Sequence, residues 1–190
     1  MAFAVTEFKS NLKQGGARPS LFRVIFDYPT NIVDPPTKAS FLVKATTIPA
    51  STIGAYDVYY HGKAIKVAGD RAFDTWDTTI INDEDFGIRN KMMEWMRWIS
   101  GKMNGERTDG YGGDGIGDVG EATVTQLGTN GKELQSYKMY SLWPSELGEI
   151  AVDWSSDAMQ EYTIGFAYDY WSSGTGSSPS NSLPPPPIGP

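Results

Sequence analysis

Short segments in which apolar and polar residues alternate recur along this chain, and this period of two most limits the folds open to it. The longest runs from Gln160 to Tyr170 and carries five apolar or aromatic side chains at every second position. Others cover Leu21–Phe26 and Ala72–Ile81. Because alternate side chains of a strand point to opposite faces of a sheet, the pattern predicts half-buried strands and a mainly β fold.

The segment Ala72–Ile81 has apolar or amphipathic side chains on both faces. Trp76 and Ile80 fall on one face, while Phe73 and Ile81 fall on the other. A strand that needs cover on both sides is typical of the interior of a sheet. We therefore expect this strand to be central.

One stretch of the chain has helical spacing. Asn82 can accept hydrogen bonds from free backbone amides, and the acids at 83–85 suit the positive end of a helix dipole. We expect a helix over about 83–100, ended by Gly101, with one apolar stripe packed against the sheet. The stripe consists of Ile88, Met92, Trp95, Met96, Ile99 and Met103.

Two hairpins are predicted. In Ala55–Val67 the turn His61-Gly62 places glycine where a two-residue turn needs positive φ, and in Glu121–Leu142 the turn Gly128–Gly131 contains Asn-Gly. The first hairpin carries more apolar surface than two strands can bury by themselves. We expect this hairpin either to fold over its own domain or to pack against a neighbouring molecule.

Glycine and proline mark the remaining boundaries. Prolines make Tyr28–Thr37 a loop, Phe41–Thr46 is expected to be a strand, and Trp143-Pro144 is expected to stop the strand before it. Gly101–Gly120 is glycine-rich and predicts a loop, while the uncharged, proline-rich Ser172–Pro190 predicts an extended tail. The expected division is an N-terminal arm (1–20), a β domain (21–171) and a C-terminal tail (172–190).

Length and charge narrow the class of protein. A chain of 190 residues can form one domain with a substantial core. Its net charge of -7 disfavours a basic surface that grips nucleic-acid phosphates, and its lack of cysteine excludes disulfides, zinc-thiolate sites and thiol nucleophiles. No segment resembles a membrane span or a signal peptide, so we expect a soluble protein that does not bind membranes.

Motifs that could carry catalysis are weak. Gly115–Gly120 has the glycine spacing of a dinucleotide-binding turn, but it follows a helix and precedes a strand, which is the wrong context. Asp109, Asp114 and Asp118 fit neither common calcium-loop spacing, and the single histidine, His61, lies at a predicted hairpin tip. No pattern singles out a carboxylate pair for glycoside hydrolysis. We expect no catalytic, cofactor or metal site.

Several ordered blocks carry a family resemblance. Residues 66–76 read Lys-Val-Ala-Gly-Asp-Arg-x-Phe-Asp-x-Trp, and Asn-Asp-Glu follows at 82–84. With these blocks the chain resembles the tail tube proteins of T-even-like contractile-tailed bacteriophages over roughly residues 17 to 171. The further blocks are Ala17–Pro19 with Leu21-Phe22, Lys44–Thr46 with Pro49-Ala50, Leu142–Pro144 with Gly148-Glu149, Asp153-Trp154, and Asp169–Trp171.

The resemblance implies a small antiparallel β-barrel or sandwich with one flanking helix. It implies hexameric rings stacked into a rigid tube in the virion, with DNA passing through the lumen and a contractile sheath outside. Baseplate and tail terminator proteins would be further partners, and assembly would take place in the host bacterial cytoplasm. The alternative is a tube of a type VI secretion system or phage-like injection particle without DNA cargo. A carbohydrate-binding β-sandwich, suggested by the many Tyr and Trp, and a glycine-loop enzyme are rivals of other classes.

The resemblance also suggests roles for two sets of residues. In such a ring the first hairpin would reach another subunit, most naturally in the next ring, through Tyr56, Val58, Tyr59, Tyr60, Lys63 and Ile65. Six chains of net charge -7 would carry -42, and an acidic lumen would let DNA slide without sticking. Strand parity gives a face but not its direction, so the lumen acids are candidates. They are Asp74, Asp77, Glu121, Glu133, Glu161 and Asp169.

Overall fold

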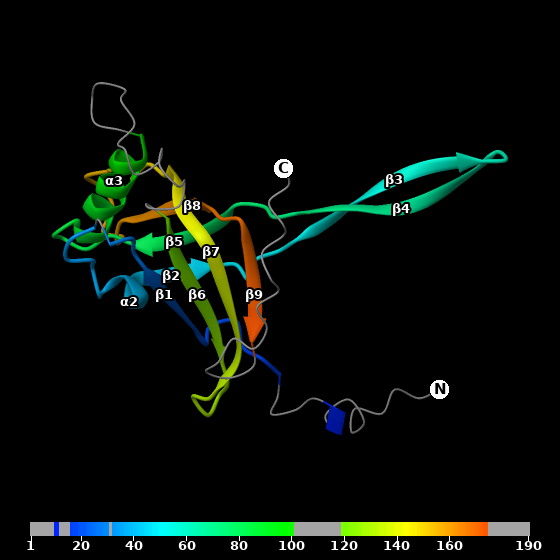
Figure 1. The fold of residues 1–190 in the computed structure, drawn as a ribbon. Helices are drawn as coiled ribbons and strands as arrows, with labels where there is room; N and C mark the ends of the chain where they lie inside the picture. Colours follow the sequence, from blue (N-terminus) through cyan, green and yellow to red (C-terminus); the bar gives the residue numbers. More distant parts are fainter. Residues whose placement is uncertain (1–9, 12–15, 31, 101–118, 175–190) are drawn as a thin grey trace.

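The computed structural model describes residues 10–11, 16–30, 32–100 and 119–174 (Figure 1). Their strands form one antiparallel seven-stranded sheet in the order β1-β6-β7-β8-β5-β2, with β9 also paired to β7, and one two-stranded sheet of β3 and β4. The mainly β prediction is confirmed. The large sheet contains β1 (Phe22–Asp27), β2 (Val43–Thr46), β5 (Trp76–Ile81), β6 (Gly120–Leu127), β7 (Glu133–Leu147), β8 (Glu161–Ala167) and β9 (Tyr170–Gly174). The other elements are β3 (Thr52–Tyr60), β4 (Lys63–Ala72), α2 (Ala39–Leu42) and α3 (Gly87–Ser100).

Strand β7 joins two halves of the large sheet. Up to Leu142 it pairs with β6 and β9, and from Trp143 onward it pairs with β8. Ser141 adopts a positive φ of 55° where the β6–β7 register shifts, so a bulge bends the strand between its two pairings. The two halves can therefore face each other across one core.

Aromatic contacts between the halves show that they do face each other. Phe26 of β1 lies 5.9 Å from Trp76 of β5 and 5.5 Å from Phe166 of β8, measured between ring centroids, although β1 is far from both in the strand order. Strands β1 and β2 end the sheet and do not pair with each other in the described part of the chain, where α2 packs against β1. A sandwich-like arrangement is present, but a closed barrel is not shown.

Burial follows the predicted alternation in the two central strands. On β5, Trp76 and Ile80 are buried and Asp77 is exposed, and on β8, Tyr162 and Phe166 are buried and Glu161 is exposed. Strand β5 lies between β2 and β8, so its predicted central position is confirmed. Gln160–Tyr170 is not one strand, however, because β8 ends at Ala167 and Tyr170 begins β9.

Helix α3 covers one side of the sheet but begins four residues later than predicted. Asn82 does not start it, since its backbone N–H donates to Gln160 O at 2.8 Å and extends the β5–β8 pairing. The first backbone N–H groups of a helix have no acceptor within the helix. Here the carboxylate of Asp85 accepts the N–H of Gly87 at 2.9 Å, which places the start of α3 at Gly87. The buried stripe is confirmed at Ile88, Met92 and Trp95, whereas Met103 lies outside the described residues. Neither α2 nor α3 is long and apolar enough to cross a membrane among the described residues.

Two predicted strand boundaries are wrong. Phe41 and Leu42 belong to α2, because their backbone amides donate to Lys38 O in a helical turn that leaves Phe41 87% exposed. Pro144 does not stop β7. It lies opposite Phe166 beside a register shift, and an irregularity of this kind is a place where a sheet tolerates proline.

Residues 73–75 separate β4 from β5, so the expected strand Ala72–Ile81 begins only at Trp76. Strand β9 takes in residues 172–174, which pair with β7, and the sheet thus extends past the expected end of the domain. The division into arm, domain and tail stays a prediction.

Candidate assembly surface

Strands β3 and β4 form a hairpin that projects from the body of the molecule (Figure 1). They pair only with each other in the described part of the chain. His61 and Gly62 both have positive φ, 47° and 75°, as a two-residue turn of the type that matches strand twist requires. The predicted turn is confirmed. We term residues 52–72 the hairpin arm.

The register of the hairpin arm gives it two unlike faces. Tyr56 pairs with Val67, Val58 with Ile65 and Tyr60 with Lys63, so all six side chains lie on one face, termed the apolar face. The opposite face carries Tyr59, alanines and an ion pair between Asp57 and Lys66 at 3.2 Å. Two uncovered strands with so much apolar surface are typical of an interaction site. The exposed fractions are 60% for Tyr56, 51% for Val58, 66% for Tyr60, 52% for Ile65 and 47% for Val67.

All the residues predicted to touch another subunit lie on this exposed arm. Tyr56, Val58, Tyr60, Lys63 and Ile65 share the apolar face, while Tyr59, 76% exposed, lies on the other. The structure therefore brings them together. Their contact with a second subunit stays a prediction.

Gly69 lies at a bulge near the root of the arm and leaves room for an aromatic ring. The β3–β4 register shifts between Ile53 and Ala55, and the Tyr56 ring lies across Gly69. A Cβ added at Gly69 would be 2.3 Å from Cε2 of Tyr56. Only glycine leaves room for the ring in this position.

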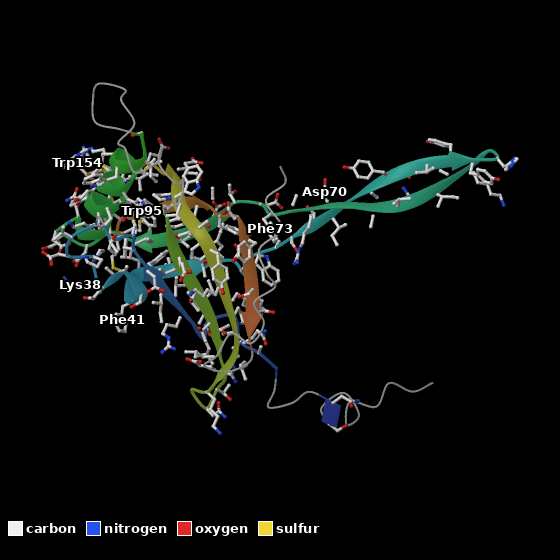
Figure 2. The ribbon with its side chains drawn as sticks, in the orientation of Figure 1. Lys38, Phe41, Asp70, Phe73, Trp95 and Trp154 are labelled. Carbon is white, nitrogen blue, oxygen red and sulfur yellow. The ribbon has the colours of Figure 1, made fainter. Side chains whose placement is uncertain are left out.

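The root of the arm is held to the body by a cluster that sequence reasoning missed. The Arg71 guanidinium lies 5.1 Å from the Phe73 ring centroid and 5.2 Å from that of Trp171, and it donates to Ser51 Oγ at 2.8 Å. Trp171 Nε1 donates to Ala50 O at 3.2 Å. Figure 2 shows Phe73 where the arm meets the body. The available signal was that Arg71 and Phe73 share one block of the family resemblance and Trp171 ends another.

The candidate lumen acids do not behave as one group. Glu121 pairs with Lys138, Glu133 pairs with Arg23 at 2.5 Å, and Glu161 pairs with Lys44 at 2.5 Å. These partly exposed ion pairs cancel charge locally and add little stability. The acids without an ion pair to any described residue are Asp74, Asp77 and Asp169, and all three are exposed.

Buried tyrosines supply no reactive group. Desolvation raises the pKa of Tyr162 to about 12, despite the nearby Arg89 guanidinium, and burial also raises the pKa of Tyr28. Neither hydroxyl has a hydrogen-bond partner among the described residues. Both stay neutral at physiological pH and are unsuited to acid–base chemistry.

Other motifs offer no site within the described residues. No three His, Asp or Glu side chains there are placed to hold a metal ion. Asp109, Asp114 and Asp118 lie outside them, as does the glycine-rich motif except for its last residues, of which Gly120 begins β6.

Comparison with known proteins connects this architecture to a family. Residues 17–173 match the phage tail tube protein family. The chain is 34% identical over 157 residues to the tail tube protein gp19 of Enterobacteria phage T4, covering 82% of this chain and 90% of that protein. It is 27% identical over 163 residues to the tail tube protein of Serratia phage KSP90, covering 84% of this chain and 89% of that protein.

Solved structures share the fold at low sequence identity. A chain of the anti-feeding prophage baseplate superposes with a TM-score of 0.65 at 11% identity, over 84% of this chain and 95% of that chain. A chain of the sheath-tube complex of the extracellular contractile injection system PVC superposes with a TM-score of 0.52 at 12% identity, over 92% of this chain and 99% of that chain. The family match spans both the hairpin arm and the large sheet. The chain therefore belongs to the phage tail tube protein family, whose members are structural components of contractile phage tails.

Proposed function

We propose that this tail tube protein closes into hexameric rings that stack into a tube, and that the hairpin arm joins neighbouring subunits. The observation that carries the proposal is the apolar face, which the rest of its own domain leaves uncovered. A paired sheet edge or a covered face in an assembly would bury it. The role is structural, and we infer no catalytic activity.

The energetics favour a contact that repeats around an assembly. Fully burying one aliphatic or aromatic side chain contributes about 1.5–3 kcal/mol, and association costs roughly 4–15 kcal/mol. Five roughly half-exposed apolar side chains on one arm therefore contribute roughly 4–8 kcal/mol, which only matches the lower part of this cost. In a ring or stack each subunit both gives and receives an arm, so two contacts act on every copy.

We infer that the tube conducts DNA inside the sheath, between a baseplate and a terminator. Negative net charge supports passage without binding, since like charges repel phosphates within a Debye length. Asp74, Asp77 and Asp169 are the best candidates for lumen charge, because their carboxylates are not neutralised by described residues. Assembly would take place in the host bacterial cytoplasm.

A tube of an injection particle without DNA cargo is the second candidate. The similarity to chains of the anti-feeding prophage and PVC particles favours it, but at 11–12% identity that similarity concerns the fold alone. The 34% identity to a phage tail tube protein favours the DNA conduit. Tubes imaged within intact particles, filled with DNA or empty, separate the two.

The test of the arm is a shortened hairpin. Replacing Asp57–Lys66 by Asn-Gly keeps the Tyr56–Val67 register pair and supplies a suitable turn. We expect a folded monomer by circular dichroism and sedimentation, whereas the full chain forms rings or tubes in negative-stain images. Deleting 53–66 outright should have the same effect. Tubes of unchanged length from the shortened chain would refute the arm's role.

A further inference from the structure

The loop between β7 and β8, residues 148–160, termed the acceptor loop, exposes apolar side chains that its own domain does not cover. Val152 is 80% exposed, Met159 73% and Trp154 fully exposed. Together with neighbouring residues they line an open hollow of about 840 Å³. An indole ring wholly in water is unfavourable in a monomer and is typical of a contact site.

The acceptor loop holds a defined shape around one carboxylate. Asp153 accepts the N–H and the hydroxyl of Ser155 at 3.0 and 2.7 Å, and Ser156 N–H donates to the Asp153 carbonyl at 3.1 Å. These hydrogen bonds from Ser155 hold the pKa of Asp153 below its ordinary range, so the carboxylate stays charged. Trp154 is thus presented on a hydrogen-bonded turn.

The charges of the two surfaces are complementary. The acceptor loop contains three acids, Glu149, Asp153 and Asp157, and neither lysine nor arginine. The outer part of the hairpin arm carries Lys63 and Lys66 but a single acid, Asp57, which pairs with Lys66. Lys63 forms no ion pair with any described residue, so it is available to an acidic partner.

The two surfaces also lie at opposite ends of the molecule. Trp154 is on the side of the body away from the hairpin arm (Figure 2). A chain cannot place its own arm on its own acceptor loop in this conformation. The same contact can be made between two copies, and a contact between unlike surfaces repeats from copy to copy into a ring or a stack.

We propose that the acceptor loop receives the hairpin arm of another copy of this chain. The apolar face of the arm packs on Trp154 and Met159, and Lys63 lies near Asp153 and Asp157. This inference rests on the proposed function, because it names the surface that the arm contacts. Phe41 on α2 is also 87% exposed, but it is a poorer receiver for an arm that carries Lys63. Its neighbours Lys38 and Lys44 are basic, and the acids beside them, Asp83 and Glu161, are already ion-paired with them.

Cross-linking between copies tests the contact directly, because the chain has no cysteine of its own. Ala64→Cys places a thiol on the exposed arm and Ser156→Cys places one on the exposed acceptor loop. Ala64 lies on the face of the arm opposite the apolar face, so the bifunctional maleimide must be long enough to reach past the two strands, and with it we expect a mixture of the two variants to give covalent dimers. Each variant alone should stay monomeric on a denaturing gel, because the contact joins unlike surfaces.

Substitutions give a second measurement. Trp154→Ala should raise the protein concentration needed for tube formation by about tenfold or more, as loss of a central aromatic anchor does. The control Phe41→Ala should leave it within about twofold. Lys63→Asp and Asp157→Lys should each weaken assembly, and the double variant should restore it.

The outcomes separate this inference from the proposed function. If the Trp154→Ala chain forms tubes at the wild-type concentration and the mixture gives no dimers, while the shortened hairpin blocks assembly, the acceptor loop is not the receiver and the arm's role stands. If the unmodified chain forms neither rings nor tubes, both proposals are overturned.

Discussion

At the scale of single residues, Arg71 connects the hairpin arm to the body through contacts of two kinds. Its guanidinium lies near the rings of Phe73 and Trp171 and donates to Ser51. Each cation–π contact is worth about 0.5–1 kcal/mol at an exposed site, which is too little to decide whether the domain folds. It is enough to bias the direction of an arm whose strands, in the described part of the chain, pair only with each other.

We therefore expect Arg71→Ala to leave the melting temperature nearly unchanged and to shorten the tubes seen by negative stain. Arg71→Lys should not restore tube length, because an ammonium lacks the planar group that stacks on both rings. Arg97→Ala removes an exposed arginine of α3 and serves as the matched control. Equal tube lengths for Arg71→Ala and Arg97→Ala would count against a positioning role.

A buried hydroxyl supplies a second residue-level test. Tyr162 is 3% exposed and its hydroxyl has no partner among the described residues, whereas the buried hydroxyl of Thr78 donates to Ile164 O at 3.4 Å. Tyr162→Phe should leave the free energy of unfolding unchanged or raise it by up to about 1 kcal/mol, because it removes an unsatisfied polar atom. Thr78→Val should lower it by about 1 kcal/mol. Urea unfolding of both variants checks the difference in sign.

At the scale of elements, contacts with distant residues move the start of α3 away from the position that the local sequence predicts. Asn82 and the acids after it suit a helix start, but pairing with Gln160 keeps Asn82 in the sheet. The helix then begins at Gly87, where Asp85 accepts the first free amide. Lys38 Nζ lies 3.2 Å from Asp83 Oδ2 and 3.6 Å from Asp85 Oδ2. A segment distant in sequence thus also helps to fix the junction between β5 and α3.

Asp85 makes the stability of this junction depend on pH. The hydrogen bond from Gly87 and the charge of Lys38 hold the pKa of Asp85 below its ordinary value in the folded state. Its contribution is therefore present above the unfolded pKa of about 3.9 and is lost as the pH falls through the folded value. Asp85→Asn should lower the melting temperature at pH 7 and have a smaller effect near pH 2. Glu84→Gln is the neighbouring control, and an Asp85→Asn effect independent of pH would contradict the assignment.

At the scale of the whole molecule, charge and assembly act together. The net charge of -7 is distributed so that some acids are paired on the sheet, whereas others, including Asp77 and Asp169, have no ion pair with a described residue. In the proposed tube, repetition would multiply any unpaired acid that faces the lumen. Its effect on DNA would then be collective and would depend on ionic strength.

We expect Asp77→Lys combined with Asp169→Lys to slow DNA ejection at low salt. The rate should return toward that of the unaltered tube as salt rises, because the Debye length falls from about 10 Å at 0.1 M to about 3 Å at 1 M. Glu84→Lys makes the same kind of charge change beside α3, at a residue that is not among the candidate lumen acids, and is the control. Ejection unaffected at low salt would show that these two acids do not face the DNA.

Much of the fold and of the hairpin arm could be predicted from sequence because the signals are local. The turn at His61-Gly62, the alternation through Tyr162–Phe166 and the helical stripe at Ile88, Met92 and Trp95 each depend on a few neighbouring residues. Such patterns fix which side chains share a face. The same kind of signal misplaced Phe41, where a competing helical turn from Lys38 overrides the apparent strand pattern, and Pro144, which lies opposite the distant Phe166 beside a register shift.

The sequence by itself determined the strand-rich class, the hairpin with its turn, and the apolar residues on that hairpin. Only the tertiary structure decided that β7 bends at Ser141 to serve both halves of the sheet, that Arg71 meets Trp171 at the root of the arm, and that the arm stands clear of its own domain. The physical reason is that periodicity and turn chemistry act over a few residues. Bends, anchors and uncovered faces depend on which distant segments pack together.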